Sequence, residues 1–259
     1  MPAPFATAHA LTLDHVTVDV QRRCVEGRRL GMVRVLEDCS LHVPAGESLA
    51  LVGPAACGKS TLLDLFAGFV RPLSGRVLVG GERVDSPAPD RGFVQPSFGL
   101  FPWRSARANV TFAAGPEVAR SADAVLDLTG VAHVADRPVG RLTAAQKQRV
   151  ALAKALVHGP GVLLLDDPFR ELDPAERALL QEELIRIQRE AAVTLVIATG
   201  NVAEAVRLGT RVAVLSPLPG RVENVVEVIP GRHIAAARAI RASLAEADRA
   251  RVSELSRAA

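Results

Sequence analysis

The sequence of 259 residues predicts an α/β fold with a mostly parallel central sheet. Four short apolar runs are bounded by polar residues or glycine, which is typical of strands buried on both faces of a sheet. These runs are SLALV (48–52), VLLLD (162–166), TLVIA (194–198) and RVAVL (211–215). Amphipathic helical patterns lie between them, including TAAQKQRVALAKALV and DPAERALLQEELIRIQREA. Strands that alternate with helices in this way favour a parallel sheet with right-handed crossovers.

Three further segments complete the predicted architecture. Residues 11–20 and 37–43 alternate apolar and polar side chains, so we expect half-buried strands in a separate antiparallel layer near the N-terminus. The segment of about 104–145 has helical stretches and no convincing strand, which predicts a helical subdomain within a main domain of residues 1–230. The tail, 231–259, is rich in Ala and Arg. We expect it to form a helix that packs weakly on the main domain or, alternatively, binds a partner.

Composition excludes several classes of protein. The formal net charge is +3, and the 31 Lys and Arg residues are interspersed with 28 acids, so we expect no nucleic-acid partner. No window reaches the roughly 18 uncharged apolar residues of a membrane span. The first residues lack the positive charge of a secretory signal, and the three cysteines match no metal-binding spacing. We therefore expect a cytoplasmic protein that reaches a membrane only through a partner.

A phosphate-binding pattern follows the first apolar run. GPAACGKST satisfies the pattern G-x-x-x-x-G-K-[ST] and stands between a predicted strand and a predicted helix. Backbone N–H groups of such a loop wrap the phosphates of a nucleotide, and the helix presents its positive end to them. We expect Lys59 to neutralise the β- and γ-phosphate oxygens, Ser60 to bind Mg²⁺ and Thr61 to reach the α-phosphate. The predicted nucleotide-binding residues are Gly53, Pro54, Ala55, Ala56, Cys57, Gly58, Lys59, Ser60 and Thr61. Cys57 is expected to react with alkylating agents, because a helix start and a neighbouring lysine favour the thiolate.

The run VLLLDDPF ends in two carboxylates, Asp166 and Asp167. A carboxylate at the C-terminal end of a central strand, beside a phosphate loop, is a suitable second ligand for Mg²⁺. We expect Asp166 to take that role. Asp167 would then face the γ-phosphate and polarise the attacking water.

Five segments in order resemble the motifs of an ABC-transporter nucleotide-binding subunit: the phosphate loop, RGFVQPSFGLFPW, RLTAAQKQRVALAKAL, LLLDDPFRELD and LVIATGNVAEAV. LFPW and RVAVLSPLPGR are similar to the branch that imports nitrate, sulfonates or taurine. The resemblance covers about residues 11–230 and implies the ABC ATPase fold, a P-loop NTPase domain with an antiparallel layer and a helical subdomain. It also implies a head-to-tail dimer, either with itself or with another ABC ATPase subunit, that encloses two ATP molecules with Mg²⁺. Hydrolysis would drive a membrane permease, so the subunit is expected on the inner face of the cell membrane.

Several functional positions of that family are altered here. The signature that contacts the γ-phosphate across the dimer falls on Leu142, Thr143, Ala144, Ala145 and Gln146, and each alanine adds a Cβ where the family has glycine. The catalytic glutamate falls on Asp167, whose shorter side chain reaches its water less well. The switch histidine falls on Gly200, which has no side chain. The glutamine that ligates Mg²⁺ falls on Pro96, and a slip of one residue turns Gln95 to the opposite face of an extended segment.

Other positions bear on partners and on the choice between interpretations. The family's adenine-stacking aromatic falls near Val20, and Arg170-Glu171 replace small residues. The resemblance implies that Phe101 and Trp103 contact the permease; packing in the core is the alternative. Together the changes predict a subunit that binds MgATP and hydrolyses it slowly or not at all. A second interpretation is a non-catalytic pseudo-ATPase that binds nucleotide structurally and pairs with an intact homologue. A third, a soluble P-loop kinase, does not explain QKQRVALAKAL.

Overall fold

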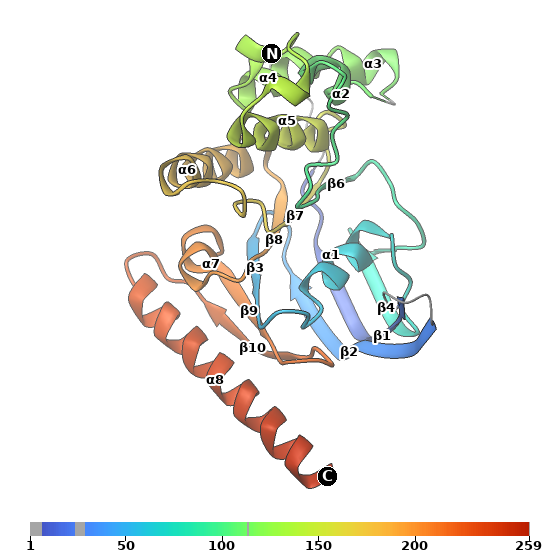
Figure 1. Ribbon diagram of the computed structural model, residues 1–259, viewed down its shortest axis with the longest axis vertical. Coiled ribbons are helices and arrows are strands. Elements are labelled where there is room, and N and C mark those ends of the chain that lie inside the picture. The colour runs from blue at the N-terminus through green and yellow to red at the C-terminus, as the bar shows by residue number, and fades with distance from the viewer. Residues whose placement is uncertain (1–6, 24–28, 113, 259) are drawn as a thin grey trace. The chain divides into compact units, whose positions relative to one another are not determined.

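The fold was examined in a computed structural model that describes residues 7–23, 29–112 and 114–258. The described chain divides into two compact units. Unit 1 takes the described residues of Met1–His9 together with Ala88–Leu195, and unit 2 takes those of Ala10–Pro87 and Val196–Ala259. Figure 1 shows the elements of both units.

An antiparallel sheet of four strands lies in unit 2, as predicted for the N-terminal layer. Its order is β2-β1-β4-β5, and its strands are β1 (Leu11–Arg23), β2 (Arg29–Val43), β4 (Ser74–Val79) and β5 (Glu82–Arg83). Leu11 and Leu13 of β1 are buried, and after a β-bulge between Leu13 and Val16 the buried residues are Val16 and Val18, so the period-two pattern of the sequence continues on either side of the bulge. The antiparallel layer is therefore confirmed.

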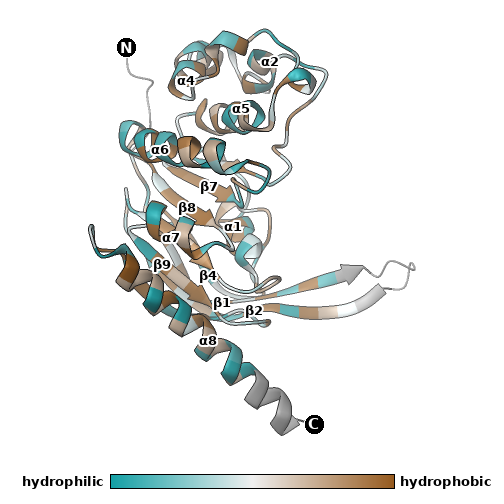
Figure 2. Ribbon diagram, turned by 60° about the vertical axis from the view of Figure 1, so that its left-hand side comes forward, coloured by the Kyte–Doolittle hydropathy of each residue, from teal (hydrophilic) through white to brown (hydrophobic). Residues whose placement is uncertain are grey.

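The second sheet is mixed and mostly parallel, which confirms the predicted fold class. Its order is β10-β9-β3-β8-β7-β6, and its strands are β3 (Ser48–Val52), β6 (Arg91–Val94), β7 (Val162–Asp166), β8 (Thr194–Ala198), β9 (Arg211–Leu215) and β10 (Val222–Glu227). In unit 2, β3 pairs parallel with β9 and β10 pairs antiparallel with β9; in unit 1, β6 pairs parallel with β7. Every residue of β3 and β8 is buried, and hydrophobic colouring marks β7 and β8 in Figure 2.

The helices of unit 1 surround the motifs that follow the phosphate loop. They are α2 (Ala106–Val110), α3 (Pro116–Ala119), α4 (Ala122–Leu128), α5 (Ala144–Leu156) and α6 (Pro174–Ala191). The range 104–145, for which we proposed a helical subdomain, holds α2, α3 and α4 with 3₁₀ turns at Ala132–Val134 and Val139–Arg141. Arg149 of α5 and Glu183 of α6 form a two-pronged ion pair at 2.7 and 2.9 Å, which joins these two helices.

Unit 2 has the helices α1 (Lys59–Ala67), α7 (Val202–Leu208) and α8 (His233–Ala258). Hydrophobic and hydrophilic patches alternate along α8, which runs beside β9 and β10 (Figure 2). Ile240 of α8 is fully buried in a cluster that also holds Val52, Val212 and Val214. The tail therefore packs more tightly than its composition predicted, since its Ala residues bring the helix close to the sheet. Within the described residues, no helix combines the length and apolar character that a membrane span requires.

Candidate functional site

The phosphate loop, residues 53–61, connects the buried strand β3 to helix α1 in unit 2. Gly58 is the N-cap of α1, with φ +96°, and gives that helix no side-chain cap. This φ strains any residue with a Cβ, and a Cβ at Gly58 would also lie 2.5 Å from Cδ2 of Leu36, so glycine is favoured here. An uncapped first turn leaves backbone N–H groups for an anion, and the helix dipole favours negative charge there. The local geometry is thus suited to phosphate.

The side chains of the phosphate loop differ in exposure. The Lys59 ammonium donates to the carbonyl oxygens of Gly53 at 2.9 Å and Pro54 at 2.8 Å, so it lies over the loop itself. Ser60 is exposed and Thr61 is half-buried. Cys57 is fully buried, with Sγ 3.5 Å from the Lys59 Nζ. Burial shields the Cys57 thiol from reagents, so the expected alkylation is not supported.

One non-glycine residue of the phosphate loop has left-handed backbone geometry. Ala56 has φ +61°, whereas Ala55 beside it is not among the residues with positive φ. Both alanines are exposed. The methyl group of Ala56 therefore contributes strain to the loop without contributing packing.

The acidic pair lies at the end of β7 in unit 1. Asp166 is the last residue of the strand and is half-buried. Asp167 follows with φ +46°, a conformation that Asp tolerates better than most residues, and its carbonyl oxygen accepts from the Arg170 backbone at 3.3 Å. Asp173 caps α6 by accepting from the backbone of Ala175 and Glu176. The tight turn from 166 to 173 thus redirects the chain directly after the two carboxylates.

The predicted signature residues form the start of α5. Thr143 is the N-cap: its hydroxyl accepts from the Gln146 backbone at 3.2 Å, and the Gln146 side chain accepts from the Thr143 backbone at 3.1 Å. This reciprocal capping box engages both polar side chains of the segment. Ala145 is buried and Ala144 is half-buried. Only the methyl group of Ala144 is therefore accessible to a ligand. This weakens the expectation that both alanines of the signature, Ala144 and Ala145, hinder contact with the γ-phosphate.

Gln95 and Gly200 each follow a strand. Gln95 is exposed directly after β6, while Pro96 beside it is half-buried. Gly200 follows β8, and a Cβ built there meets no atom within 4 Å. Asn201 caps α7, and the Thr199 hydroxyl donates to the buried Glu204 at 2.6 Å. The position predicted for a switch residue is thus an open site at a well-fixed helix start.

The residues of LFPW belong to an aromatic cluster in unit 1. The Phe101 ring lies 5.6 Å from the Trp103 ring and 4.7 Å from the Phe112 ring, measured between centroids. The Arg104 guanidinium lies 4.9 Å from the Phe112 centroid, and Lys154 Nζ lies 5.6 Å from the Phe101 centroid. Trp103 is 74% exposed, so the core-packing alternative is wrong for this residue.

Two residues of this region were not singled out from the sequence. The buried side chain of Asn109 accepts from the Phe101 backbone N–H at 2.7 Å and donates to the Phe101 carbonyl at 3.0 Å, which fixes the loop that presents Trp103. Lys154 donates to the Gly99 carbonyl at 2.7 Å, and burial lowers the pKa of this ammonium. The spacing from Phe101 to Asn109 gave no signal, because only the folded chain brings the two together.

The predicted site residues are divided between the units. Unit 2 holds residues 53–61 and Gly200, and unit 1 holds Gln95, the signature residues and the acidic pair. Ser60 offers a hydroxyl oxygen and Asp166 a carboxylate oxygen, which are the donor types that Mg²⁺ prefers. The described residues contain no group of three or more His, Cys, Asp or Glu suited to a metal. Each of these two oxygen donors, taken within its own unit, is of a type suited to Mg²⁺ whose remaining ligands are phosphate oxygens or water.

Comparisons with known proteins agree on one family. The family model described as ABC transporter matches residues 36–170. The chain is similar to the taurine import ATP-binding protein TauB of Roseobacter denitrificans, with 38% identity over 200 residues that cover 74% of each chain. It is also similar to the nitrate import ATP-binding protein NrtC of Synechococcus elongatus, with 39% identity over 207 residues that cover 76% of this chain and 31% of that protein.

Two solved structures share the fold. The dimeric MJ0796, a bacterial ABC transporter cassette, superimposes with a TM-score of 0.71 and 26% identity, covering 85% of this chain and 99% of that one. The cbiO1 protein from Clostridium perfringens, part of the ABC transporter complex cbiONQ, has a TM-score of 0.72 and 28% identity, covering 87% of this chain and 90% of that one.

Proposed function

The chain belongs to the ABC transporter family, and from this premise we propose that it is the ATP-binding subunit of an importer for a small anion such as nitrate, a sulfonate or taurine. The observation that carries the proposal is the phosphate loop between β3 and α1, with its uncapped helix start and its lysine. The names of the similar proteins support the class of cargo.

In this proposal, the backbone of the phosphate loop and the N-terminus of α1 bind the triphosphate of ATP. Lys59 exchanges its two carbonyl partners for phosphate oxygens. Ser60, and separately Asp166, are the residues that we propose as ligands of Mg²⁺, which supplies charge neutralisation between the phosphates when it is bound. The expected loss of nucleotide binding in Lys59→Ala tests this step by calorimetry. Unchanged ATP affinity in that variant would contradict the proposed site.

We further propose that hydrolysis is weakened. Asp167 is shorter than the glutamate of the family, and Gly200 offers no side chain to the attacking water. Loss of one such group typically costs about 10²–10⁴ in rate. Groups that act as a unit do not lose rate independently, so these factors are not multiplied. We expect the wild-type protein to release phosphate more slowly than about 1 s⁻¹, the lower end of ordinary enzyme turnover.

The double variant Asp167→Glu with Gly200→His tests the weakened chemistry. The open space at Gly200 accepts a larger side chain, so the fold should tolerate the change. We expect steady-state phosphate release to rise at least tenfold. The matched control is the double variant Asp167→Asn and Gly200→Ala, which supplies neither the carboxylate nor the imidazole. Wild-type turnover well above 1 s⁻¹ would show that the substitutions matter less than we propose. A double variant no faster than its control would contradict restored hydrolysis and would favour the second candidate below.

The second candidate, a pseudo-ATPase that pairs with an intact homologue, is favoured by the absence of a side chain at Gly200. It predicts that the double variant still fails to turn over as a homodimer. It also predicts that turnover appears only when a second ABC ATPase subunit with an intact signature is present. Analytical ultracentrifugation with ATP distinguishes a dimer of this chain from a mixed dimer.

The exposed aromatic cluster is proposed as the permease contact, and this contact would hold the subunit at the inner face of the membrane. A large exposed aromatic ring beside an arginine is typical of residues that dominate interfaces. We expect Trp103→Ala to abolish copurification with the permease while ATP affinity stays unchanged. Leu179→Ala is the matched control, because Leu179 of α6 is 56% exposed in the same unit. Equal losses in both variants, or a fall in ATP affinity in Trp103→Ala, would contradict the docking role.

A further inference from the structure

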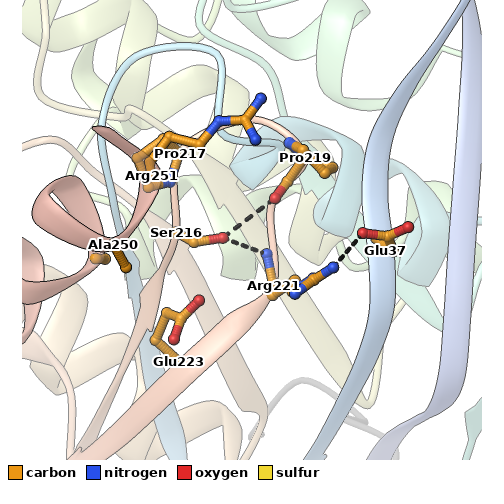
Figure 3. Close-up of a pocket in the computed structure, with 9 residues that line it drawn as sticks. Glu37, Ser216, Pro217, Pro219, Arg221, Glu223, Ala250 and Arg251 are labelled. Atoms are coloured by element: carbon orange, nitrogen blue, oxygen red, sulfur yellow. Dashed lines mark hydrogen bonds and ion pairs between the residues drawn. The ribbon is translucent and has the colours of Figure 1, made fainter. Parts of the chain in front are cut away.

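The motif SPLPGR, residues 216–221, has no part in the proposed nucleotide site. It forms the turn between β9 and β10, and Figure 3 shows it beside a small cavity. The Ser216 hydroxyl accepts from the Arg221 backbone at 2.9 Å and donates to the Pro219 carbonyl at 3.1 Å. The Ser216 backbone N–H donates to the Arg221 carbonyl at 3.0 Å. The turn is therefore a closed and internally bonded unit.

Gly220 brings the backbone of this turn against the phosphate loop. Its N–H donates to the Val35 carbonyl at 2.8 Å, and its carbonyl accepts from the Glu37 backbone at 3.0 Å and from Sγ of Cys39 at 3.3 Å. A Cβ at Gly220 would lie 2.0 Å from the carbonyl oxygen of Cys57. Real Cβ atoms do not approach an oxygen closer than 3.0 Å, so the Cys57 backbone would have to move by about 1 Å.

An ion pair fixes the turn to β2. The Arg221 guanidinium donates to the Glu37 carboxylate (Figure 3). Arg34 donates to the same carboxylate at 3.3 Å. The hydrogen bond from Arg221, and next that from Arg34, lowers the pKa of Glu37, so the carboxylate is charged at neutral pH. A cavity of about 100 Å³, lined by Glu37, Ser216 and Arg221 among others, borders the pair. Substitutions of these side chains therefore meet free space rather than packed atoms.

We propose that the turn at 216–221 positions the phosphate loop for nucleotide binding, with Gly220 as the point of contact and Arg221 as the positioning side chain. The inference rests on the proposed nucleotide site and adds a support for it. The carbonyl of Cys57 precedes Gly58, the N-cap of α1, so a displaced Cys57 carbonyl tilts the N–H groups aimed at phosphate. In catalysis, a misplacement of about 1 Å costs on the order of 100-fold in rate, so we expect a smaller but measurable effect of such a shift on nucleotide binding.

Gly220→Ala tests the contact. We expect ATP affinity to fall at least tenfold by calorimetry, and Cys57 to become reactive toward N-ethylmaleimide in nucleotide-free protein, as followed by peptide mass mapping. Gly31→Ala is the matched control, since Gly31 of β2 has no atom within 4 Å of its Cβ position and no left-handed φ. Wild-type affinity and wild-type Cys57 labelling in Gly220→Ala would overturn the proposal.

Arg221 provides a second route that does not depend on the folding of the glycine variant. We expect Arg221→Ala to weaken ATP binding about three- to tenfold with an unchanged melting temperature, and Arg221→Lys to restore most of the affinity. Arg221→Ala combined with Glu37→Gln should bind ATP no worse than Arg221→Ala alone, because the Arg221–Glu37 pair is already broken and Arg34 keeps Asp19 as its other partner. Wild-type affinity in Arg221→Ala, or no rescue by lysine, would contradict the positioning role. If the wild-type protein itself binds no ATP, the proposed function fails, and Cys57 labelling still decides the contact.

Discussion

Ala56→Gly should stabilise the protein, although replacing alanine by glycine usually does the reverse. Ala56 has φ +61°, and left-handed geometry costs a residue with a Cβ about 1–2 kcal/mol. Glycine removes that strain but gains freedom in the unfolded chain, which costs about 0.4–1 kcal/mol. Ala56 is exposed, so no packing is lost. The expected balance is a gain of about 0–1.6 kcal/mol in the free energy of unfolding, with a middle value of about 0.8 kcal/mol.

Ala55→Gly is the control for Ala56→Gly. The two alanines are neighbours and both are exposed, but Ala55 has no positive φ to relieve. Ala55→Gly should therefore lower the free energy of unfolding by about 0.4–1 kcal/mol. Urea denaturation measures both variants, read as shifts of midpoint at constant slope. An Ala56→Gly protein that is less stable than wild type, or equal shifts in the two variants, would refute the argument from backbone strain.

Three further predictions concern stability. Ile240→Ala should lower the free energy of unfolding by about 2–5 kcal/mol, because Ile240 is fully buried. Ile234→Ala on the same helix, at a residue that is 77% exposed, should change this free energy by less than about 0.5 kcal/mol. Similar urea midpoints for the two variants would contradict the packing of α8. Burial raises the pKa of the Cys39 thiol from 9.0 to about 11, so its stabilising effect is complete below pH 9 and is lost as the pH rises toward 11. Urea titrations between pH 8 and 11 should show a loss of about 2–3 kcal/mol in the free energy of unfolding, and in Cys39→Ser this free energy should fall less steeply with pH. An equally steep fall in the variant would rule out Cys39 as its source. Thr143→Val removes the N-cap of α5 and should lower the melting temperature by an amount equivalent to about 1 kcal/mol. Thr143→Ser should restore the melting temperature. A valine variant as stable as wild type would show that the cap contributes little.

The sequence predicted the buried strands of the large sheet well, because a fully buried strand is a continuous apolar run. The runs at 48–52, 162–166, 194–198 and 211–215 coincide with β3, β7, β8 and β9. Four strands, β4, β5, β6 and β10, were not predicted. The first half of β4 is exposed, β5 has two residues, β6 has four residues with a glycine, and β10 is only half-buried, so none of them has a clear apolar period.

Motif spacing predicts which residues make up the candidate site, and that assignment stays a prediction, whereas motif spacing could not predict which of their side chains are buried. The strand and helix on either side of the phosphate loop follow from local pattern. The burial of Cys57 and Ala145 and the exposure of Trp103 depend on neighbours distant in the sequence, such as Asn109 for the loop that carries Trp103. The close approach of Gly220 to the Cys57 carbonyl joins residues more than 160 positions apart, and no local periodicity of the sequence signals such a contact.

Gly200 is a suitable position for attaching a spectroscopic reporter, because it has no side chain. A side chain introduced there projects into space that no atom occupies within 4 Å, so a spin label or a small fluorophore would not distort the start of α7. Under the proposed function, with Gly200 at the switch position, the environment of the reporter would change when a triphosphate, but not a diphosphate, is bound. The missing side chain thereby offers a direct way to watch the bound nucleotide in an otherwise unaltered subunit.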